Sequence, residues 1–423
     1  MAGRGVTLQP PGATSDPGPS AGPPGDPPRP AVPEHGAPVP SGAGGPAAEP
    51  LAVSLDVTAV PENPSGAGRY TIDLAAALSR RDDVTLAFVA RKGDGSRWEA
   101  LSPGAVVVAD APRSRPLRLA WEQARLPRVL RDLPVRAHHS PHYTMPESSE
   151  LPTVVTVHDL TFFDHPEWHE RGKVALFRRA IRVAARHADA VVCVSRATAD
   201  RLAELCPAAG QVRVIPHGVD LTRFTPEPGA AAVDDATALA ALGVREPFVA
   251  FVGTIEPRKD VPTLVRAFDR MASSHPELSL VLAGVDGWGA KEVTAAIAVA
   301  SHGDRVVRTG YVPDDSVPSL LRRASAVAYP SLEEGFGLPA LEALACGAPL
   351  VTTTGSAMEE MASGAAMLVD PRDAGGLAGV LDMLVRGDAG LAARRQRGLA
   401  VAARHTWEAS GRAHAELYRS VAG

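Results

Sequence analysis

The stretch "SAVAYPSLEEGFGLPALEALACGAPLVTT", Ser325–Thr353, predicts a strand, a loop, a helix and a second strand. The first apolar run ends near Ser331. A helical run begins at Pro339, which suits a first turn because its missing N–H is not needed there. Gly347 and Pro349 end the helix before the second apolar run. Two strands joined through a helix in this way pair in parallel.

The same alternation runs along the chain from Leu51. The expected strands are LAVSLDV, DVTLAFVA, TVVTVHD, DAVVCVS and VRVIPHG, followed by PFVAFVG, LSLVLAG, DRVVRTG, ASAVAYPS, APLVTT and AAMLVD. They predict two α/β domains, residues 51–225 and 243–395, with a Pro-bearing linker at 226–242. Residues 396–423 are expected to hold a C-terminal helix, with its packing on either domain, a return to the N-terminal domain included, left open.

Composition excludes several classes of protein. The chain has 423 residues and a net charge of −5, which gives no overall attraction to nucleic acid. Three scattered cysteines, no long apolar run and no secretory signal favour a cytoplasmic protein. Residues 1–50 hold 14 of the 39 prolines and ten glycines, so we expect a disordered extension there.

Glu334 and Glu342 stand out within the opening stretch. Glu334 lies in the loop and Glu342 about one turn into the helix, so both can face one ligand. Carboxylates accept hydrogen bonds from sugar hydroxyls, and the helix N-terminus with Gly335 and Gly337 favours a phosphate. The other interpretation is a helix that carries two surface glutamates. Composition alone does not choose between them.

The segment "PSLEEGFGLPALEALACGAPLVTT" resembles the donor-site signature of the family 4 retaining glycosyltransferases, some of which are bacterial mannosyltransferases. The resemblance covers essentially residues 51–420 and implies the GT-B fold, in which two Rossmann-like domains face each other across a cleft. It implies that Glu334 contacts the donor sugar and Glu342 the nucleotide ribose. The implied backbone contacts to the donor fall on Gly335, Phe336, Gly337 and Leu338.

A second motif, "FVGTIEPRKDVPTL", places two cations after a strand that ends at Gly253. Arg258 offers a planar fork and Lys259 a point charge, which together suit a diphosphate. A solvated basic turn is the alternative. The resemblance implies that Gly253 borders the donor and that both cations stabilise the leaving nucleotide. Many members carry another Arg where this chain has Thr254.

Two further motifs lie in the N-terminal half. "NPSGAGRYTIDL" puts Gly66 and Gly68 in a loop before a helix, and "TVVTVHDLTFF" puts His158 just past a strand. By themselves they fit a simple turn and a hydrogen-bonded core histidine. The resemblance implies that the glycines border the donor phosphates and that His158 lies against the donor sugar, with Asp159 orienting it.

The expected reaction is transfer of a hexose from a nucleotide diphosphate sugar to a hydroxyl acceptor, with retention. The acceptor is a glycan, a lipid-linked sugar or a small molecule. The resemblance favours GDP-mannose as co-substrate. With no Asp-x-Asp motif, no metal and no cofactor are expected. The alternatives are a sugar-nucleotide epimerase of the same fold and a non-catalytic nucleotide-sugar-binding protein.

Seven arginines and two acids lie between Arg113 and Arg136. They allow peripheral contact with the inner face of a membrane or with an acidic acceptor, but a solvated helix face is favoured. Two segments here, "WEQARLP" and "HHSPHYTMP", resemble segments of bacterial mannosyltransferases.

Overall fold

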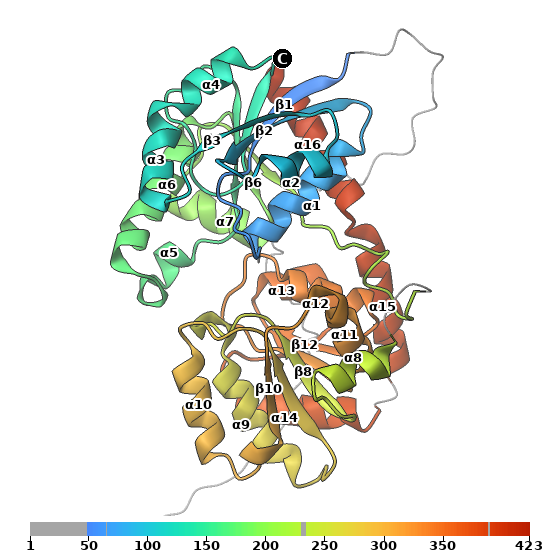
Figure 1. The fold of residues 1–423 in the computed structure, drawn as a ribbon. Coiled ribbons are helices and arrows are strands. Elements are labelled where there is room, and N and C mark those ends of the chain that lie inside the picture. Colours follow the sequence, from blue (N-terminus) through green and yellow to red (C-terminus); the bar gives the residue numbers. More distant parts are fainter. Residues whose placement is uncertain (1–48, 65, 230–233, 388–389) are drawn as a thin grey trace, which may run out of the picture. The chain divides into compact units, whose positions relative to one another are not determined.

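The structure is a computed structural model that describes residues 49–64, 66–229, 234–387 and 390–423. Two parallel β-sheets, each flanked by helices, form two Rossmann-like domains (Figure 1). This confirms the α/β class and the two parallel-sheet domains that the sequence predicts. The expectation of disorder over residues 1–50 falls, apart from residues 49 and 50, outside the described residues.

The N-terminal sheet has seven parallel strands in the order β3-β2-β1-β4-β5-β6-β7. The order reverses between the neighbours β1 and β4, and ligands of open parallel sheets bind beyond the carboxyl ends of the strands at such a point. The strands are β1 (Leu51–Asp56), β2 (Val84–Arg91), β3 (Val106–Ala111), β4 (Ala137–Ser140), β5 (Thr153–Val157), β6 (Ala190–Cys193) and β7 (Gln211–Val214). The helices are α1 (Ala67–Ser79), α2 (Gly95–Leu101), α3 (Arg115–Ala124), α4 (Leu126–Asp132), α5 (Thr161–Asp164), η1 (Pro166–Trp168), α6 (Arg171–His187) and α7 (Arg196–Leu205).

The C-terminal sheet has six parallel strands in the order β10-β9-β8-β11-β12-β13. Its order reverses between β8 and β11, so the loops that follow these two strands start side by side. The strands are β8 (Phe248–Val252), β9 (Ser279–Ala283), β10 (Val306–Gly310), β11 (Ala326–Tyr329), β12 (Leu350–Thr353) and β13 (Met367–Val369). The helices are α8 (Asp235–Ala241), η2 (Pro257–Lys259), α9 (Val261–Ala272), α10 (Ala290–Val299), η3 (Gly303–Arg305), η4 (Asp314–Ser316), α11 (Val317–Arg323), α12 (Leu338–Ala345), α13 (Ala357–Ala362) and α14 (Ala374–Val385).

The C-terminal region forms two helices, where the sequence suggested one. α15 (Leu391–Arg404) packs on α12, and α16 (Trp407–Ala422) lies beside α1 (Figure 1). Trp407 and Tyr418 of α16 are buried in the hydrophobic core of the N-terminal sheet. The end of the chain thus supports the domain that β1 begins.

Three elements differ from the sequence-based expectation. The expected linker contains α8, whose Ala238 and Leu239 are buried, Leu239 in the core of the second sheet. The strands β3 and β4 were not expected. β3 has the apolar sequence VVVADA and could have been found, whereas β4 consists of Ala-His-His-Ser and does not look apolar. Its His138 and His139 are nevertheless fully buried, since Ser54 and Tyr418 hydrogen-bond to them at 2.7 Å each.

No helix within the described ranges is long and apolar enough to cross a membrane.

Candidate active site

The loop between β11 and α12 presents Glu334, and its glycines permit a close approach to the chain around it. Gly337 adopts a φ of 90° as it starts α12, a conformation that L side chains rarely adopt. A Cβ on residue 335 would collide with the carbonyl oxygen of His158, which follows β5 in the other domain. The loop therefore meets the N-terminal domain at a position that only glycine can occupy.

Glu334 lies between the two predicted cations. Arg258 donates to one carboxylate oxygen, and Lys259 pairs with the other. Ser331 Oγ also donates to Oε1 at 3.2 Å. The side chains of Glu334 and Lys259 are each only 7% exposed. These contacts arise because β8 and β11 are neighbours, and Leu332 N donates to Arg258 O at 2.8 Å, which ties the two loops together.

The charges of this cluster determine the ionisation of Glu334. Burial alone would raise the pKa of the carboxyl, but Arg258 and Lys259 lower it to about 2. Burial lowers the pKa of Lys259, an effect that Glu334 opposes. Arg258 has a second carboxylate partner, since its Nε donates to Glu256 Oε2 at 2.8 Å. Two cations and two carboxylates thus form one charged network, of which sequence reasoning missed Glu256.

Glu342 lies on α12 in a separate group of charges. Among the described residues, no hydrogen bond or ion pair reaches its carboxylate. Burial, with Asp73 and Asp314 nearby, raises its pKa to about 7, although Arg69 and Arg223 pull it down. Because Arg69 and Asp73 lie on α1, Glu342 faces the first helix of the N-terminal domain. It is therefore a polar group with free acceptor capacity.

A bridge between the domains borders Glu342. Arg69 Nη1 donates to Asp314 Oδ2 at 2.6 Å, and Arg223 donates to the Asp314 carbonyl. Asp314 opens η4, the 3₁₀ turn before α11. The sequence did not identify Asp314 or Arg223, because acidic and basic residues in loops are common and nothing local marks their pairing.

His158 is held by the backbone of another loop. Its Nε2 hydrogen-bonds to Pro141 O at 2.8 Å, so this nitrogen carries the proton. The rings of Tyr70 and Tyr143 meet the imidazole edge-on, with centroids at 5.0 and 5.7 Å. Burial lowers the pKa of His158, so the ring is neutral at neutral pH. The charge of Asp159 acts on this ring and opposes the lowering of its pKa, while Asp159 Oδ1 accepts from Thr161 N at 3.2 Å and Thr161 Oγ1 at 2.8 Å.

The remaining predicted residues lie around these groups. Gly66 starts α1 with a φ of 49°, and the space for a Cβ on Gly68 is taken by Pro61 and Pro64. Gly253 follows β8 and packs against Gly284. A Cβ on residue 284 would collide with the carbonyl oxygen of Gly253.

The side chain of Phe336 is buried, with 5% of the residue exposed, and its ring meets the His217 ring edge-on with the centroids 4.8 Å apart. A ligand would therefore contact Phe336 through its backbone. Leu338 is the first residue of α12.

A cavity of about 200 Å³ adjoins the Glu334 loop. Residues of both domains line it. Asp159 and Thr198 come from the N-terminal domain, and Glu333, Glu334, Gly335 and Ser356 come from the C-terminal domain. Burial, followed by the charge of Asp164, raises the pKa of Glu333 to about 7. The cavity brings Asp159, which follows His158, to the wall that carries Glu334. Of the predicted site residues, only Glu334 and Gly335 line it; the others, His158, Arg258, Lys259 and Glu342 among them, do not.

This geometry defines a class of protein. Two Rossmann-like domains meet at the Glu334 loop. The buried Lys259 and the half-buried Arg258 beside it suit a diphosphate, and the carboxylates suit sugar hydroxyls. Such a site fits an enzyme that handles a nucleotide-linked sugar.

Comparison with known proteins gives the family. Residues 64–223 match the family described as "Glycosyltransferase Family 4", and residues 240–398 match "Glycosyl transferases group 1". The chain belongs to this glycosyltransferase family, whose two matched regions take in both Rossmann-like domains. It is a glycosyltransferase that uses a nucleotide-sugar donor, as the resemblance of the donor-site segment implied.

Curated relatives include two kinds of enzyme. The chain is 27% identical over 296 residues to the O-antigen chain mannosyltransferase B of Escherichia coli. This alignment covers 69% of the chain and 74% of the relative. It is 36% identical over 202 residues to the D-inositol 3-phosphate glycosyltransferase of Salinispora arenicola, an alignment that spans 44% of each protein. The chain thus spans less than half of this second relative.

Solved structures share the fold. The sucrose-phosphate synthase of Thermosynechococcus elongatus superposes with a TM-score of 0.70 at 22% identity, covering 88% of this chain and 98% of that one. Anabaena HepE in complex with UDP and glucose superposes with a TM-score of 0.69 at 20% identity. This match covers 88% of the present chain and 100% of the HepE chain. These likenesses confirm the GT-B fold.

Proposed function

We propose that this glycosyltransferase transfers a hexose, namely mannose from GDP-mannose, to a hydroxyl group. The acceptor is a glycan, a lipid-linked sugar or a small molecule. The reaction retains the configuration at the anomeric carbon and uses no metal ion. The observation that carries the proposal is the pairing of Glu334, which lines the cavity, with Arg258 and Lys259 behind it. Mannose is favoured by the similarity to the O-antigen chain mannosyltransferase.

The proposed catalytic groups are Glu334, His158, Arg258 and Lys259. Arg258 and Lys259 stabilise the charge that grows on the leaving diphosphate, which is the task that a metal ion performs elsewhere. Because these cations are already fixed by Glu334, they need little reorganisation during the reaction. The leaving phosphate then takes the proton of the incoming hydroxyl on the same face of the sugar.

The proposed donor contacts divide by ligand part. The backbone of Gly335, Phe336, Gly337 and Leu338 approaches the sugar, and the N-terminus of α12 adds its positive end. Glu342 accepts from the ribose hydroxyls, which its unpartnered carboxylate allows. Gly66 and Gly68 border the phosphates from the start of α1, in whose first turn the structure puts Gly68 rather than in the preceding loop, and Gly253 borders them from the start of the loop after β8.

Contact with a membrane is a separate part of the proposal. Arg118 is buried, Arg131 pairs with Glu150 at 3.1 Å, and Arg136 donates to the carbonyl of Gly423 at 3.0 Å. The exposed Arg125 and Arg128 remain for anionic headgroups or an acidic acceptor. Sedimentation with anionic vesicles, compared with neutral ones, tests this; equal binding to both would remove the membrane role.

A donor screen tests the proposal. Thermal unfolding is measured with GDP-mannose, UDP-glucose and the corresponding free nucleotides, because a cognate donor stabilises the fold by mass action. We expect GDP-mannose to raise the melting temperature most. Product NMR then reads the anomeric configuration. Inversion at that carbon, or activity that a chelator abolishes and magnesium restores, would contradict the proposed mechanism.

A further inference from the structure

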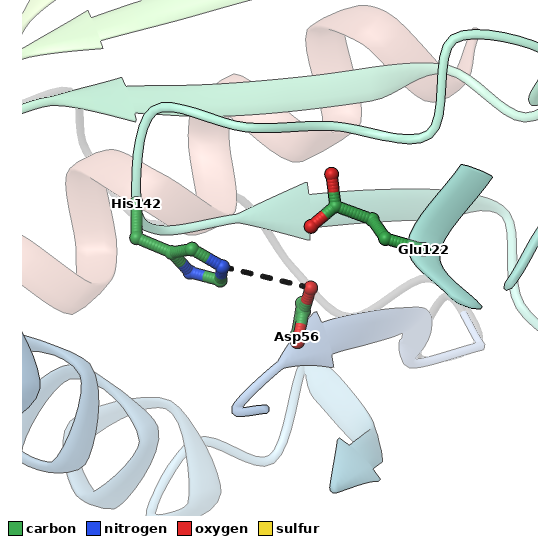
Figure 2. Close-up of side chains that lie close together, drawn as sticks. All are labelled: Asp56, Glu122 and His142. Carbon is green, nitrogen blue, oxygen red and sulfur yellow. Dashed lines mark ion pairs between the residues drawn. The ribbon is translucent and has the colours of Figure 1, made fainter. Parts of the chain in front are cut away.

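A second polar cluster lies in the N-terminal domain, beyond the carboxyl ends of β1 and β4. Asp56 ends β1, His142 follows β4, and Glu122 comes from α3; their side chains point toward one another (Figure 2). The candidate ligand atoms of the three residues lie within 4.8 Å of one another. His142 Nε2 is 3.8 Å from Asp56 Oδ2, and these side chains are only 11% and 1% exposed. The cluster sits where the strand order of this sheet reverses.

Asp56 has one oxygen without a partner. Its Oδ1 accepts from Thr58 N at 2.8 Å, but Oδ2 is buried and receives no hydrogen bond. Burial would raise the pKa of Asp56, but His142, His138, Thr58 and Arg118 together lower it, so the group is ionised. An ionised, buried oxygen without a donor is costly, and native proteins rarely keep one unless a ligand or water completes it.

The other groups argue against a metal ion at this place. Both oxygens of Glu122 are occupied: Gln123 Nε2 donates to Oε1 at 3.1 Å and Thr144 Oγ1 to Oε2 at 2.8 Å. A cation is also already present, since Arg118 Nη1 lies 3.5 Å from His142 Nε2 and 4.0 Å from Glu122 Oε2. A divalent ion would find Asp56 Oδ2 without a partner, but His142 Nε2 and both Glu122 oxygens are engaged, and the guanidinium repels it.

Arg118 supplies what a hydroxyl group needs. It donates through Nη1 to Thr58 Oγ1 at 3.2 Å. Within the described part of the chain, its Nε and Nη2 have no hydrogen-bond partner. A hydroxyl placed here can donate to Asp56 Oδ2 and accept from Arg118, so it would complete both groups at once.

The cluster is linked to the proposed reaction centre by one loop. Gln123 Nε2 donates to Met145 O at 2.9 Å, and Thr144 is held by Glu122, so α3 fixes the segment that follows β4. Pro141 of this segment holds His158, and the Tyr143 ring meets that imidazole edge-on. The segment after β4 thus contacts α3 of the cluster on one side and His158 on the other. The two segments "WEQARLP" and "HHSPHYTMP", far apart in the sequence, meet here.

We propose that Asp56 and Arg118 form a hydroxyl-binding site for the acceptor, which selects a neutral polyhydroxylated acceptor over a phosphorylated one. The proposal rests on the function proposed above. Its selectivity follows from what Asp56 needs. The ionised Oδ2 lacks a hydrogen-bond donor, which a hydroxyl group supplies and a dianionic phosphate does not, and the charge of Asp56 repels the phosphate. Burial raises the pKa of the neighbouring Glu122 to about 7, so this carboxyl adds only part of a negative charge at neutral pH. Glu122 and Gln123 are positioning residues that hold the loop.

The experiment measures acceptor binding without turnover. Ligand-observed NMR follows methyl α-D-mannoside and D-myo-inositol 3-phosphate on the full chain with no donor present. We expect binding of the mannoside and little binding of the phosphate. Asp56→Asn keeps the size of the side chain and its contact to Thr58 N, but cannot accept the ligand proton. It should weaken mannoside binding by about 10- to 100-fold, the usual effect of losing a hydrogen bond to a charged group.

Controls separate this idea from a structural effect and from the proposed function. Asp110→Asn removes an exposed carboxylate on β3 and should bind the mannoside like the parent. The thermal shift caused by the donor should persist in Asp56→Asn, which shows that its fold and donor site are intact. Failure of the proposed function would appear differently, as a parent enzyme that releases no nucleotide from any donor with any acceptor.

Three results would overturn the inference. They are a parent that prefers the inositol phosphate or binds neither probe, an Asp56→Asn variant with parental mannoside affinity, and one equivalent of a divalent metal that elemental analysis finds in the parent but not in Asp56→Asn. The last result would mark the cluster as a metal site instead.

Discussion

Replacing Glu334 by glutamine should destabilise the fold by about 3 kcal/mol at neutral pH. The pKa of the carboxyl falls from its ordinary 4.5 to about 2 in the folded chain, because Arg258 and Lys259 outweigh the effect of burial. Each pKa unit corresponds to roughly 1.4 kcal/mol, so the ionised state contributes about 3 kcal/mol. Glutamine has the shape of the protonated acid and loses this contribution. It also leaves two cations, one of them buried, without their shared partner.

The sign of the effect fixes its pH dependence. The folded pKa is depressed, so the stabilisation is present above pH 4.5 and is lost as the pH falls toward 2. Urea unfolding of parent and variant, followed by circular dichroism, gives the difference in unfolding free energy at each pH. We expect about 3 kcal/mol at pH 7.5 and about 2 kcal/mol at pH 3.5.

The neighbouring carboxylate provides a matched control. The pKa of Glu333 is raised to about 7, mainly by burial, so its ionised form does not stabilise the fold. Glu333→Gln should therefore increase stability as the pH rises from 4.5 to 7 and keep that gain above 7, the opposite sign from Glu334→Gln. Equal stability of parent and Glu334→Gln at pH 7.5, or a difference that does not shrink in acid, would refute the ion-pair reasoning.

Further predictions concern turnover and binding. Lys259→Met should lower kcat by on the order of 10²–10³ and donor affinity much less, as measured by steady-state kinetics and calorimetry; parental turnover would exclude Lys259 from the electrostatics of the leaving group. The affinity of the parent for intact donor should rise between pH 6 and 8 as Glu342, with its pKa of about 7, ionises, and this rise should disappear in Glu342→Gln. Gly335→Ala should impair both folding and activity because its Cβ meets the His158 carbonyl, so a fully active variant would show that the two domains do not approach there. A chelator should change the activity of neither the parent nor Lys259→Met.

The sequence by itself determined the fold class and located the motifs that we propose bind the donor. Strands such as β8 and β12 are buried on both faces of a parallel sheet, so they appear as short, continuous apolar runs whatever their partners are. The glycines and Pro339 mark the loop and helix around Glu334 because their backbone requirements are local. For the same reason the spacing of Glu334 and Glu342 could be interpreted before any tertiary contact was known.

The tertiary structure alone decided which charges meet. Lys259 and Glu334 pair because β8 and β11 are neighbours, and strand order is not encoded within either loop. The buried histidines of β4 resemble loop residues in the sequence, since their partners Ser54 and Tyr418 come from distant elements. Asp56 is likewise one acid among many until the fold buries it and leaves one oxygen without a donor. Burial and long-range pairing set the energy of a polar group, and both are properties of the packed chain.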